Sequence, residues 1–349
     1  MTQFIGQTFP EEWLWSKYER KCIDSISNQI DKRFVGQKNL LVNLTWFGPQ
    51  FDHQGNSYAQ FLEHNQNVDN LFLLATVDPP MITKQQIGAI TKMKGDPKVF
   101  KLGNFDGPHQ FNFFAPIIAK HFKEYDNDDI VLKDPKWHYI NYNRKPRQHR
   151  VELVKKIIAK GLDKFGLLTL GKPDTTYDND PHNNLYLTLG EKNEDYVATG
   201  HWFTQEDKDD DVGIPHDVLS LHNINYWQGH FLHIIGATEF SSDVDLFISE
   251  TQYKPILGLR PFVINGNPKT YQWLEEQGFK TFNKYFPGID LMDSSKVHES
   301  IISVIEQLKE MTPDQIMSKY EAMMPDLLHN QKHFGTFARQ QQLKIDNLF

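Results

Sequence analysis

The chain has 349 residues, 39% of them hydrophobic and 13% aromatic, and a formal net charge of −8 at pH 7. This length predicts two domains of ordinary size, and the negative charge argues against a general duplex-DNA binder, whose surface must attract phosphates. Cys22 is the only cysteine, which excludes an intramolecular disulfide and a cysteine-based zinc site. With no run of roughly 18 apolar residues for a membrane span and no signal-peptide pattern, the expected location is the cytoplasm.

The first part of the chain alternates between predicted strands and predicted helices. Short apolar runs bounded by turn residues predict strands at residues 39–47 and 70–77 and a weaker strand at 99–102. Helices are predicted between them, at residues 57–66 and 83–94. This alternation is typical of a parallel α/β sheet.

The same pattern begins again after residue 132. Apolar runs predict further strands at residues 137–142, 165–170, 230–235, 245–249 and 261–265. Glycines and cap residues delimit predicted helices at residues 146–160, 268–277 and 293–309, and a last helix that opens at Thr312-Pro313.

Two α/β runs in series predict two doubly wound, Rossmann-like domains that face each other across a cleft. We expect residues 1–132 to form the first domain, to which residues 313–349 return, and residues 133–312 to form the second. Ligands of such sheets bind beyond the carboxyl ends of the strands, so polar residues at strand ends are the candidates for a site.

Residues 246–266 hold the clearest functional pattern, read as strand, sharp turn, short helix and strand. Glu250 is predicted where the first strand ends, and its carboxylate is suited to accept hydrogen bonds from a ribose diol. Thr251 is a candidate cap of the helix, whose N-terminus attracts a diphosphate, and Lys254 adds a positive charge. Gly258 would allow close packing one turn later.

This segment resembles the donor-binding motif of glycosyltransferases with the GT-B fold, above all that of the α-1,3-fucosyltransferase group and related bacterial and phage proteins. In that group a strand ends in Ser/Thr-Glu, a basic residue follows, and a small residue precedes a Pro-hydrophobic strand and a glycine turn. The resemblance covers roughly residues 137–310 and implies a nucleoside-diphosphate sugar as donor. In the fucosyltransferases Lys follows Glu directly, whereas Thr251 follows Glu250 here, so the donor sugar stays open.

A basic turn precedes the helix predicted at residues 146–160. Asn143, Arg144 and Arg147 follow a predicted strand, and Arg150 shares a helix face with Arg147. Arginine makes planar bidentate contacts with phosphate oxygens, so this turn is a candidate diphosphate clamp whose side chains we expect to be exposed without ligand. Cations are disfavoured at a helix N-terminus, and a bound anion would remove this conflict. The turn also looks like the Asn-Arg turn that opens the donor domain of the resembling group.

An inverting transfer needs a base to deprotonate the acceptor hydroxyl. Asp52 and Asp106 follow predicted strands of the first domain and are the first and second candidates, although a solvated loop residue is the stronger interpretation of each. Glu239 follows a strand of the second domain and could meet the donor. His230 and His233 could line a sugar pocket, but core packing is the stronger interpretation, and residues three apart on a strand face opposite sides, which disfavours a metal site.

Together with these patterns, the resemblance implies a glycosyltransferase that moves a sugar from a nucleoside-diphosphate sugar to a hydroxyl of a glycan or another molecule. Residues 1–132 would then be the acceptor-side domain and residues 133–312 the donor-binding domain. No Asp-x-Asp pair stands in a clean strand-end setting, so the reaction is expected to need no metal ion and no cofactor beyond the donor. Two alternatives stay open. One is a phage-type glycosyltransferase that acts on modified DNA bases, with nucleic acid only as acceptor. The other is a non-catalytic glycan-binding or virion structural protein on a degenerate transferase fold.

Overall fold

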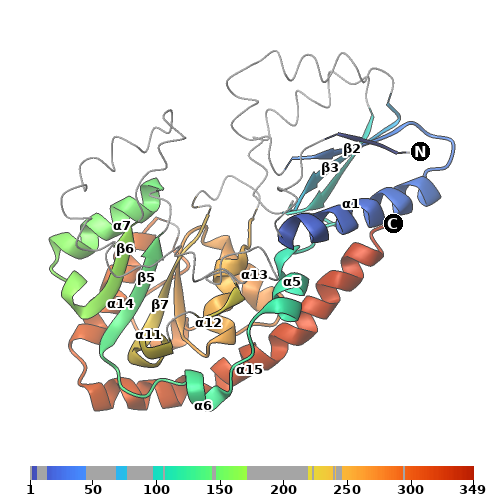
Figure 1. Cartoon of the computed structure of the whole chain (residues 1–349). Coiled ribbons are helices and arrows are strands. Elements are labelled where there is room, and N and C mark those ends of the chain that lie inside the picture. The colour runs from blue at the N-terminus through green and yellow to red at the C-terminus, as the bar shows by residue number, and fades with distance from the viewer. Residues whose placement is uncertain are drawn as a thin grey trace.

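The computed structural model describes residues 2–5, 14–44, 68–76, 97–104, 107–143, 147–170, 219–221, 224–238, 240, 246–293 and 295–349. These residues form two α/β halves that lie side by side, each built on a parallel sheet of four strands (Figure 1). Both ends of the chain lie in the first half. The architecture is the Rossmann-like α/β arrangement with two parallel sheets that the sequence predicts.

The first sheet has the strand order β1-β2-β3-β4, and all of its strands are parallel. The strands β2 and β3 are buried on both faces, as expected for near-continuous apolar runs in a parallel sheet. The elements of this half are β1 (Gln3–Ile5), α1 (Leu14–Arg33), β2 (Asn39–Asn43), β3 (Asn70–Ala75), β4 (Lys98–Gly103) and α5 (Phe114–His121). The short helix α6 (Asn127–Ile130) follows and lies against the second half (Figure 1).

The second sheet has the order β6-β5-β7-β8 and is also parallel throughout. Its strands are β5 (Trp137–Asn143), β6 (Gly166–Leu170), β7 (His230–Gly236) and β8 (Phe262–Asn265). The helices around it are α7 (Gln148–Ala159), η1 (Asp163–Phe165), α11 (Ile224–Gly229), η3 (Glu250–Gln252), α12 (Tyr253–Leu257), α13 (Lys269–Glu276), η4 (Asn283–Tyr285) and α14 (Val297–Lys309).

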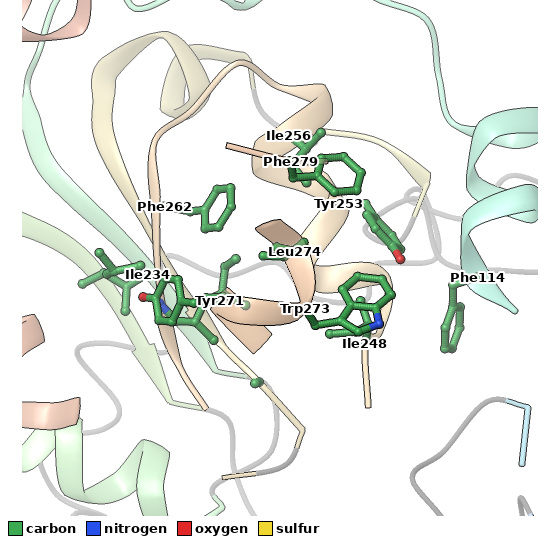
Figure 2. Packing of buried hydrophobic residues seen from close by; sticks show 14 of the residues in the cluster. Phe114, Ile234, Ile248, Tyr253, Ile256, Phe262, Tyr271, Trp273, Leu274 and Phe279 are labelled. Atoms are coloured by element: carbon green, nitrogen blue, oxygen red, sulfur yellow. The ribbon is translucent and has the colours of Figure 1, made fainter. Parts of the chain in front are cut away.

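The core of the second half is rich in aromatic side chains (Figure 2). The hydroxyl of Tyr271 on α13 accepts a 2.7 Å hydrogen bond from the amide of Ile264 in β8, which satisfies both buried groups. Phe114 of α5 faces this core from the first half, and its ring lies 6.2 Å from that of Phe247. Burial of each such side chain contributes about 1.5–3 kcal/mol, so apolar packing joins the two halves as well as filling each of them.

The last helix, α15 (Pro313–Asp346), is 34 residues long and runs from the second half to the first (Figure 1). Thr312 and Gln315 form a capping box at its start, which is the predicted cap-then-proline beginning. At its far end, Gln29 of α1 donates a 2.8 Å hydrogen bond to the carbonyl of Ile345. Among the helices of the described residues, none has the length and the apolar character needed to cross a bilayer.

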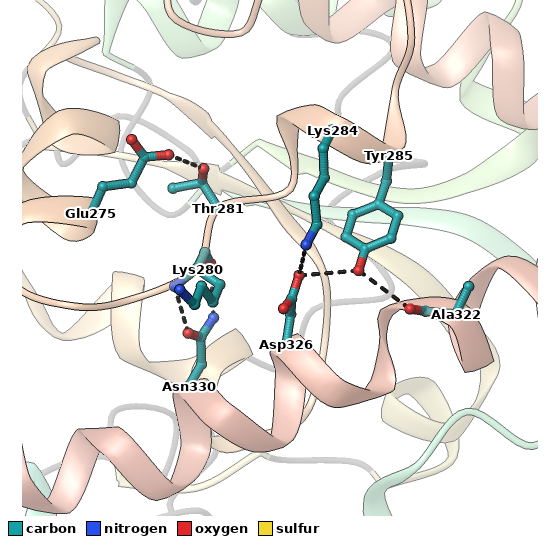
Figure 3. A network of polar contacts seen from close by, with 8 residues as sticks. All are labelled: Glu275, Lys280, Thr281, Lys284, Tyr285, Ala322, Asp326 and Asn330. Carbon is teal, nitrogen blue, oxygen red and sulfur yellow. Dashed lines mark hydrogen bonds and ion pairs between the residues drawn. The ribbon is translucent and has the colours of Figure 1, made fainter.

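Polar contacts fasten the first part of α15 to the second half (Figure 3). Asp326 accepts a hydrogen bond from Lys284 at 2.7 Å and another from the hydroxyl of Tyr285 at 3.0 Å. One turn further on, the side chain of Asn330 bonds both the amide and the carbonyl of Lys280. The helix is therefore held by the second half before it reaches the first.

Most predicted elements are confirmed, with ends that differ by a few residues. The predicted strands other than 245–249 correspond to β2 through β8, and the predicted helices at 146–160, 268–277 and from Thr312 correspond to α7, α13 and α15. Helix α14 begins at Val297, later than the predicted start at 293. The helices predicted at 57–66 and 83–94 lie outside the described residues.

The strand predicted at residues 245–249 is wrong. Residues 246–249 are buried, but among the described residues they pair with no strand. Their apolar side chains are buried at the junction of the two halves, where the ring of Phe247 meets Phe114 and the carbonyl of Ile248 accepts a hydrogen bond from Asn112. The apolar run thus predicted correctly that these residues are buried, but predicted wrongly that they form a strand of the sheet.

Candidate functional site

The direction in which successive strands are added to the second sheet changes at β5. From β5 the chain forms β6 on one side, and later β7 on the other side. In open parallel sheets such a reversal is the place where ligands bind, just outside the carboxyl ends of the two central strands. Here those ends are Asn143 of β5 and Gly236 of β7, and α7 begins shortly after Asn143. We call this group, together with residues 147–150 and 237–238, the switch-point site.

Asn143 is buried at the centre of the switch-point site. Its Nδ2 donates to Oδ1 of Asn141 at 2.7 Å and to the carbonyl of Thr169 at 3.2 Å. Its Oδ1 is buried as well. Gly236 makes this arrangement possible, because a Cβ there would lie 2.4 Å from Asn143 Oδ1. Asn143 thus places a buried amide at the carboxyl end of β5, where a ligand of the sheet would bind.

The arginines of the basic turn bind backbone carbonyls at the end of β7. Arg150 is buried, and its Nη2 donates to the carbonyls of Gly236 at 2.7 Å and Ala237 at 2.8 Å. Arg147 is half-buried and donates to the carbonyl of Thr238. Arg147 was expected to be exposed without ligand, and this expectation is wrong. The partial negative charge of three carbonyl oxygens compensates the two cations at the N-terminus of α7.

His149 lies between these arginines in sequence and is buried beside them. Burial, aided by the charge of Arg150, lowers the pKa of His149 to about 3, so the imidazole is neutral near neutral pH. Its Nε2 donates to the carbonyl of Ala237 at 3.0 Å. Its ring stacks on Phe240 at 5.1 Å, and Phe240 in turn meets the ring of His298 on α14 at 5.3 Å. The segment after β7 is thus packed between α7 and α14.

The turn that holds Glu250 is capped by Ser249. Ser249 Oγ accepts from the amide of Thr251, and the side chain of Gln252 accepts from the amide of Ser249 at 3.0 Å, which completes a capping box. Thr251 is therefore not the cap of the helix, as the sequence had suggested, and its hydroxyl instead bonds Ser249 Oγ at 2.8 Å. Glu250 is half-buried at the first position of η3, which contacts β7.

Lys254 lies on α12, and Gly258 directly follows that helix. Both lie near buried residues of β7 and α11. Lys254 is half-buried, and its charge adds to burial in lowering the pKa of His233 to about 3. A Cβ on Gly258 would lie 2.2 Å from the indole of Trp227, whose Nε1 donates to the carbonyl of Gly258. Trp227 lies in α11, immediately before β7, so Gly258 is a packing glycine at the amino end of the strands.

His230 and His233 are both core residues. Their rings lie 5.8 Å apart, and both contact Trp227, so the two side chains do not face opposite sides of the sheet. His230 is the first residue of β7, directly after α11, where ideal strand alternation does not yet apply. Burial lowers the pKa of His230 well below its usual range, and the core-packing interpretation fits both residues.

Four predicted site residues lie outside the described residues: Asp52, Asp106, Arg144 and Glu239. The sequence did not single out a buried carboxylate that the structure places at the carboxyl ends of β2 and β3. Glu19 of α1 is fully buried there and accepts hydrogen bonds from Asn43 at 2.9 Å and Thr76 at 2.7 Å. The available signal was a polar residue inside each of these two predicted runs, Asn43 in the first and Thr76 in the second.

A narrow hollow lies between the two halves. It has about 270 Å³ of empty space, part of it open to solvent, and is too tight as it stands to enclose a sugar ring. The first half contributes polar amides to it, the second half contributes Trp273 and Gln277, and α15 contributes Gln341 and Lys344. The remaining lining residues are Asn104, Gln110, Phe111, Asn112, Leu246 and Ile248.

Within the described ranges, no three or more His, Cys, Asp or Glu side chains are grouped so that they could hold a metal ion. The chain was compared with protein-family models, with curated proteins and with solved structures, and none of them matches it. The resemblance to glycosyltransferases therefore rests on the residues of the two segments alone.

Proposed function

We propose that this chain is a glycosyltransferase that takes its sugar from a nucleoside-diphosphate donor and passes it to a hydroxyl acceptor. The observation that supports this best is the switch-point site, where the strand order reverses beside an arginine-bearing helix N-terminus. Such a position suits an anionic nucleotide, because amide groups and cations converge there.

The proposal gives roles to residues of the switch-point site and to Glu250. The amides at the start of α7 and the guanidinium of Arg147 would bind the diphosphate and stabilise its charge as the sugar leaves. Asn143, buried at the end of β5, would accept a hydrogen bond from the sugar nucleotide through its Oδ1. Glu250 would accept hydrogen bonds from the ribose. Arg150 serves the site indirectly, because it holds the carbonyls of Gly236 and Ala237 in place.

The test begins with a thermal-shift panel of UDP-, GDP-, CDP- and ADP-sugars, followed by calorimetry on each nucleotide that raises the melting temperature. Arg147→Ala should weaken binding of the selected nucleotide by about 1.5–3 kcal/mol. Arg339→Ala, an exposed arginine on α15, is the control and should bind as the wild type does. Equal affinity in wild type and Arg147→Ala would place the diphosphate elsewhere.

The same panel separates the alternatives. A non-catalytic structural or glycan-binding protein should show no selective response to any sugar nucleotide, and that result would refute the transferase proposal. A transferase that acts on modified DNA bases should respond to a sugar nucleotide and should also bind duplex DNA with a steep salt dependence.

A further inference from the structure

Asn112 joins three parts of the molecule that are far apart in sequence. It is 3% exposed and stands just before α5. Its backbone amide donates to Oε1 of Gln341 on α15 at 2.9 Å, and its Nδ2 donates to the carbonyl of Ile248 at 2.7 Å. Its Oδ1 accepts from the amide of Ala115 in the first turn of α5 at 2.9 Å. Every polar group named here is thus satisfied in a buried environment.

The bond to Ile248 crosses from the first half to the turn that carries Glu250. Ile248 directly precedes Ser249, the cap of η3, and residues 246–249 pair with no strand in the described part of the chain. A strand is held in position by its hydrogen bonds to neighbouring strands, but residues 246–249 are not held in this way. Figure 2 shows Ile248 beside Trp273, with Phe114 of the first half facing it. The hydrogen bond from Asn112 therefore supplies a directional contact where apolar packing alone gives none.

We propose that Asn112 is a positioning residue that holds the turn at Ile248–Glu250 from the opposite half of the protein. This inference rests on the proposed function in so far as Glu250 binds the ribose of the donor. A residue of the first half then sets the place of a donor-binding carboxylate in the second half, and nucleotide affinity depends on contact between the halves.

The variant Asn112→Asp isolates the bond to Ile248. Aspartate keeps an oxygen for the amide of Ala115, and the backbone amide that bonds Gln341 is unchanged. The Nδ2 donor is lost, and a carboxylate oxygen takes its place against the carbonyl of Ile248, a change of charge that the control variant below shares. The helix α5 therefore keeps its side-chain acceptor, since Asp and Asn serve equally well at a helix start.

Asn330→Asp is the matched control (Figure 3). Asn330 is 1% exposed, its Oδ1 accepts from the amide of Lys280 at 2.7 Å and its Nδ2 donates to the carbonyl of Lys280 at 2.9 Å. The same chemical change at Asn330 thus removes the same kind of buried bond to a backbone carbonyl. These bonds are to Lys280 and not to the Ile248–Glu250 turn. Asn330→Asp should therefore lower the stability of the protein but leave the turn in its position.

The first measurement is hydrogen exchange of the protein without nucleotide, followed by mass spectrometry. In Asn112→Asp, peptides that cover residues 246–257 should exchange roughly tenfold faster than in the wild type, because the turn has lost its anchor. In Asn330→Asp these peptides should exchange at the wild-type rate. Unchanged exchange in Asn112→Asp, or an equal rise in both variants, would overturn the positioning role.

The second measurement is the affinity for the nucleoside diphosphate selected by the thermal-shift panel. Asn112→Asp should bind it roughly tenfold more weakly, whereas Asn330→Asp should stay within about twofold of the wild type. Faster exchange with unchanged affinity would show that Asn112 holds the turn but that the turn does not bind the donor, which overturns the proposal. If the wild type binds no nucleotide, the proposed function fails, and the exchange result alone decides whether Asn112 holds the turn.

Discussion

The guanidinium of Arg260 donates a 3.0 Å hydrogen bond to the hydroxyl of Tyr320, and both side chains are buried. Among the described residues no carboxylate pairs with Arg260. Its other hydrogen bonds go to the carbonyls of Trp227, Gly258 and Leu259, near the carboxyl-terminal ends of α11 and α12. These ends carry partial negative charge, which compensates the buried cation, and the contact with Tyr320 fastens α15 to the second sheet.

Arg260→Ala should therefore lower the free energy of unfolding by about 3–5 kcal/mol, because it opens a cavity and leaves buried carbonyls without donors. Tyr320→Phe removes two hydrogen bonds, the one from Arg260 and the one to the carbonyl of Leu259, and should cost about 1–3 kcal/mol. Urea titrations followed by circular dichroism measure both values. A loss below about 1 kcal/mol for Arg260→Ala would show that the carbonyls find other donors.

Two glycines should respond to alanine in opposite directions. Gly258→Ala should destabilise the protein by about 1–3 kcal/mol, because the new methyl group overlaps the indole of Trp227. Gly335→Ala, in the interior of α15 with open space around it, should stabilise by about 0.5–1 kcal/mol through helix propensity. Melting temperatures of the two variants test this contrast. A neutral Gly258→Ala would contradict the packing role.

Glu250 can be tested through the ribose it is proposed to bind. Glu250→Ala should bind the selected nucleoside diphosphate more weakly and should hardly distinguish it from its 2′-deoxy form, whereas the wild type should prefer the ribose form. Calorimetry with both nucleotides gives the ratio of affinities. A purely structural carboxylate would instead lower the melting temperature and leave that ratio unchanged.

Buried histidines should make the protein sensitive to acid. The pKa of His233 is lowered to about 3 in the folded state, from an ordinary value of 6.5. Between these values the unfolded chain binds a proton that the folded protein does not, so stability falls as pH falls from 6.5 toward 3. His149 acts in the same direction. Unfolding in urea at about pH 7 and about pH 5 should show this loss.

His233→Gln removes one of these titrating groups. The difference in unfolding free energy between about pH 7 and about pH 5 should shrink by about 1–2 kcal/mol in this variant. Phe231→Leu, a buried change on the same strand without a titratable group, should lower stability equally at both pH values. An unchanged pH dependence in His233→Gln would mean that His233 is protonated within the fold.

Local patterns predicted the two sheets because a buried parallel strand is visible as a short apolar run between turn residues. The runs that became β2, β3 and β7 are of this kind. The run at residues 245–249 has the same appearance and is no strand, since whether an extended apolar segment enters a sheet depends on an available neighbour. The helix α1 was not predicted, and its polar composition leaves only a narrow apolar stripe.

The candidate site was predictable only in part. The basic turn stands at the end of β5, where a sequence reveals it, whereas Glu250 follows a segment that is no strand. The acceptors of Arg147 and Arg150 are carbonyls of a segment about 90 residues away. The buried amide of Asn112 and the carboxylate of Glu19 depend on partners from distant elements. In the sequence alone, Asn112 and Glu19 look like ordinary polar surface residues.

The course of α15 also sets an order of assembly during synthesis. The ring of Phe349 packs against Phe34, Phe72 and Phe100, and Gln29 bonds the backbone of Ile345, so the first half completes its core with the end of this helix. The ribosome makes these residues after the whole of the second sheet. The half that is synthesised first therefore keeps an apolar face uncovered until residues 345–349 have been made.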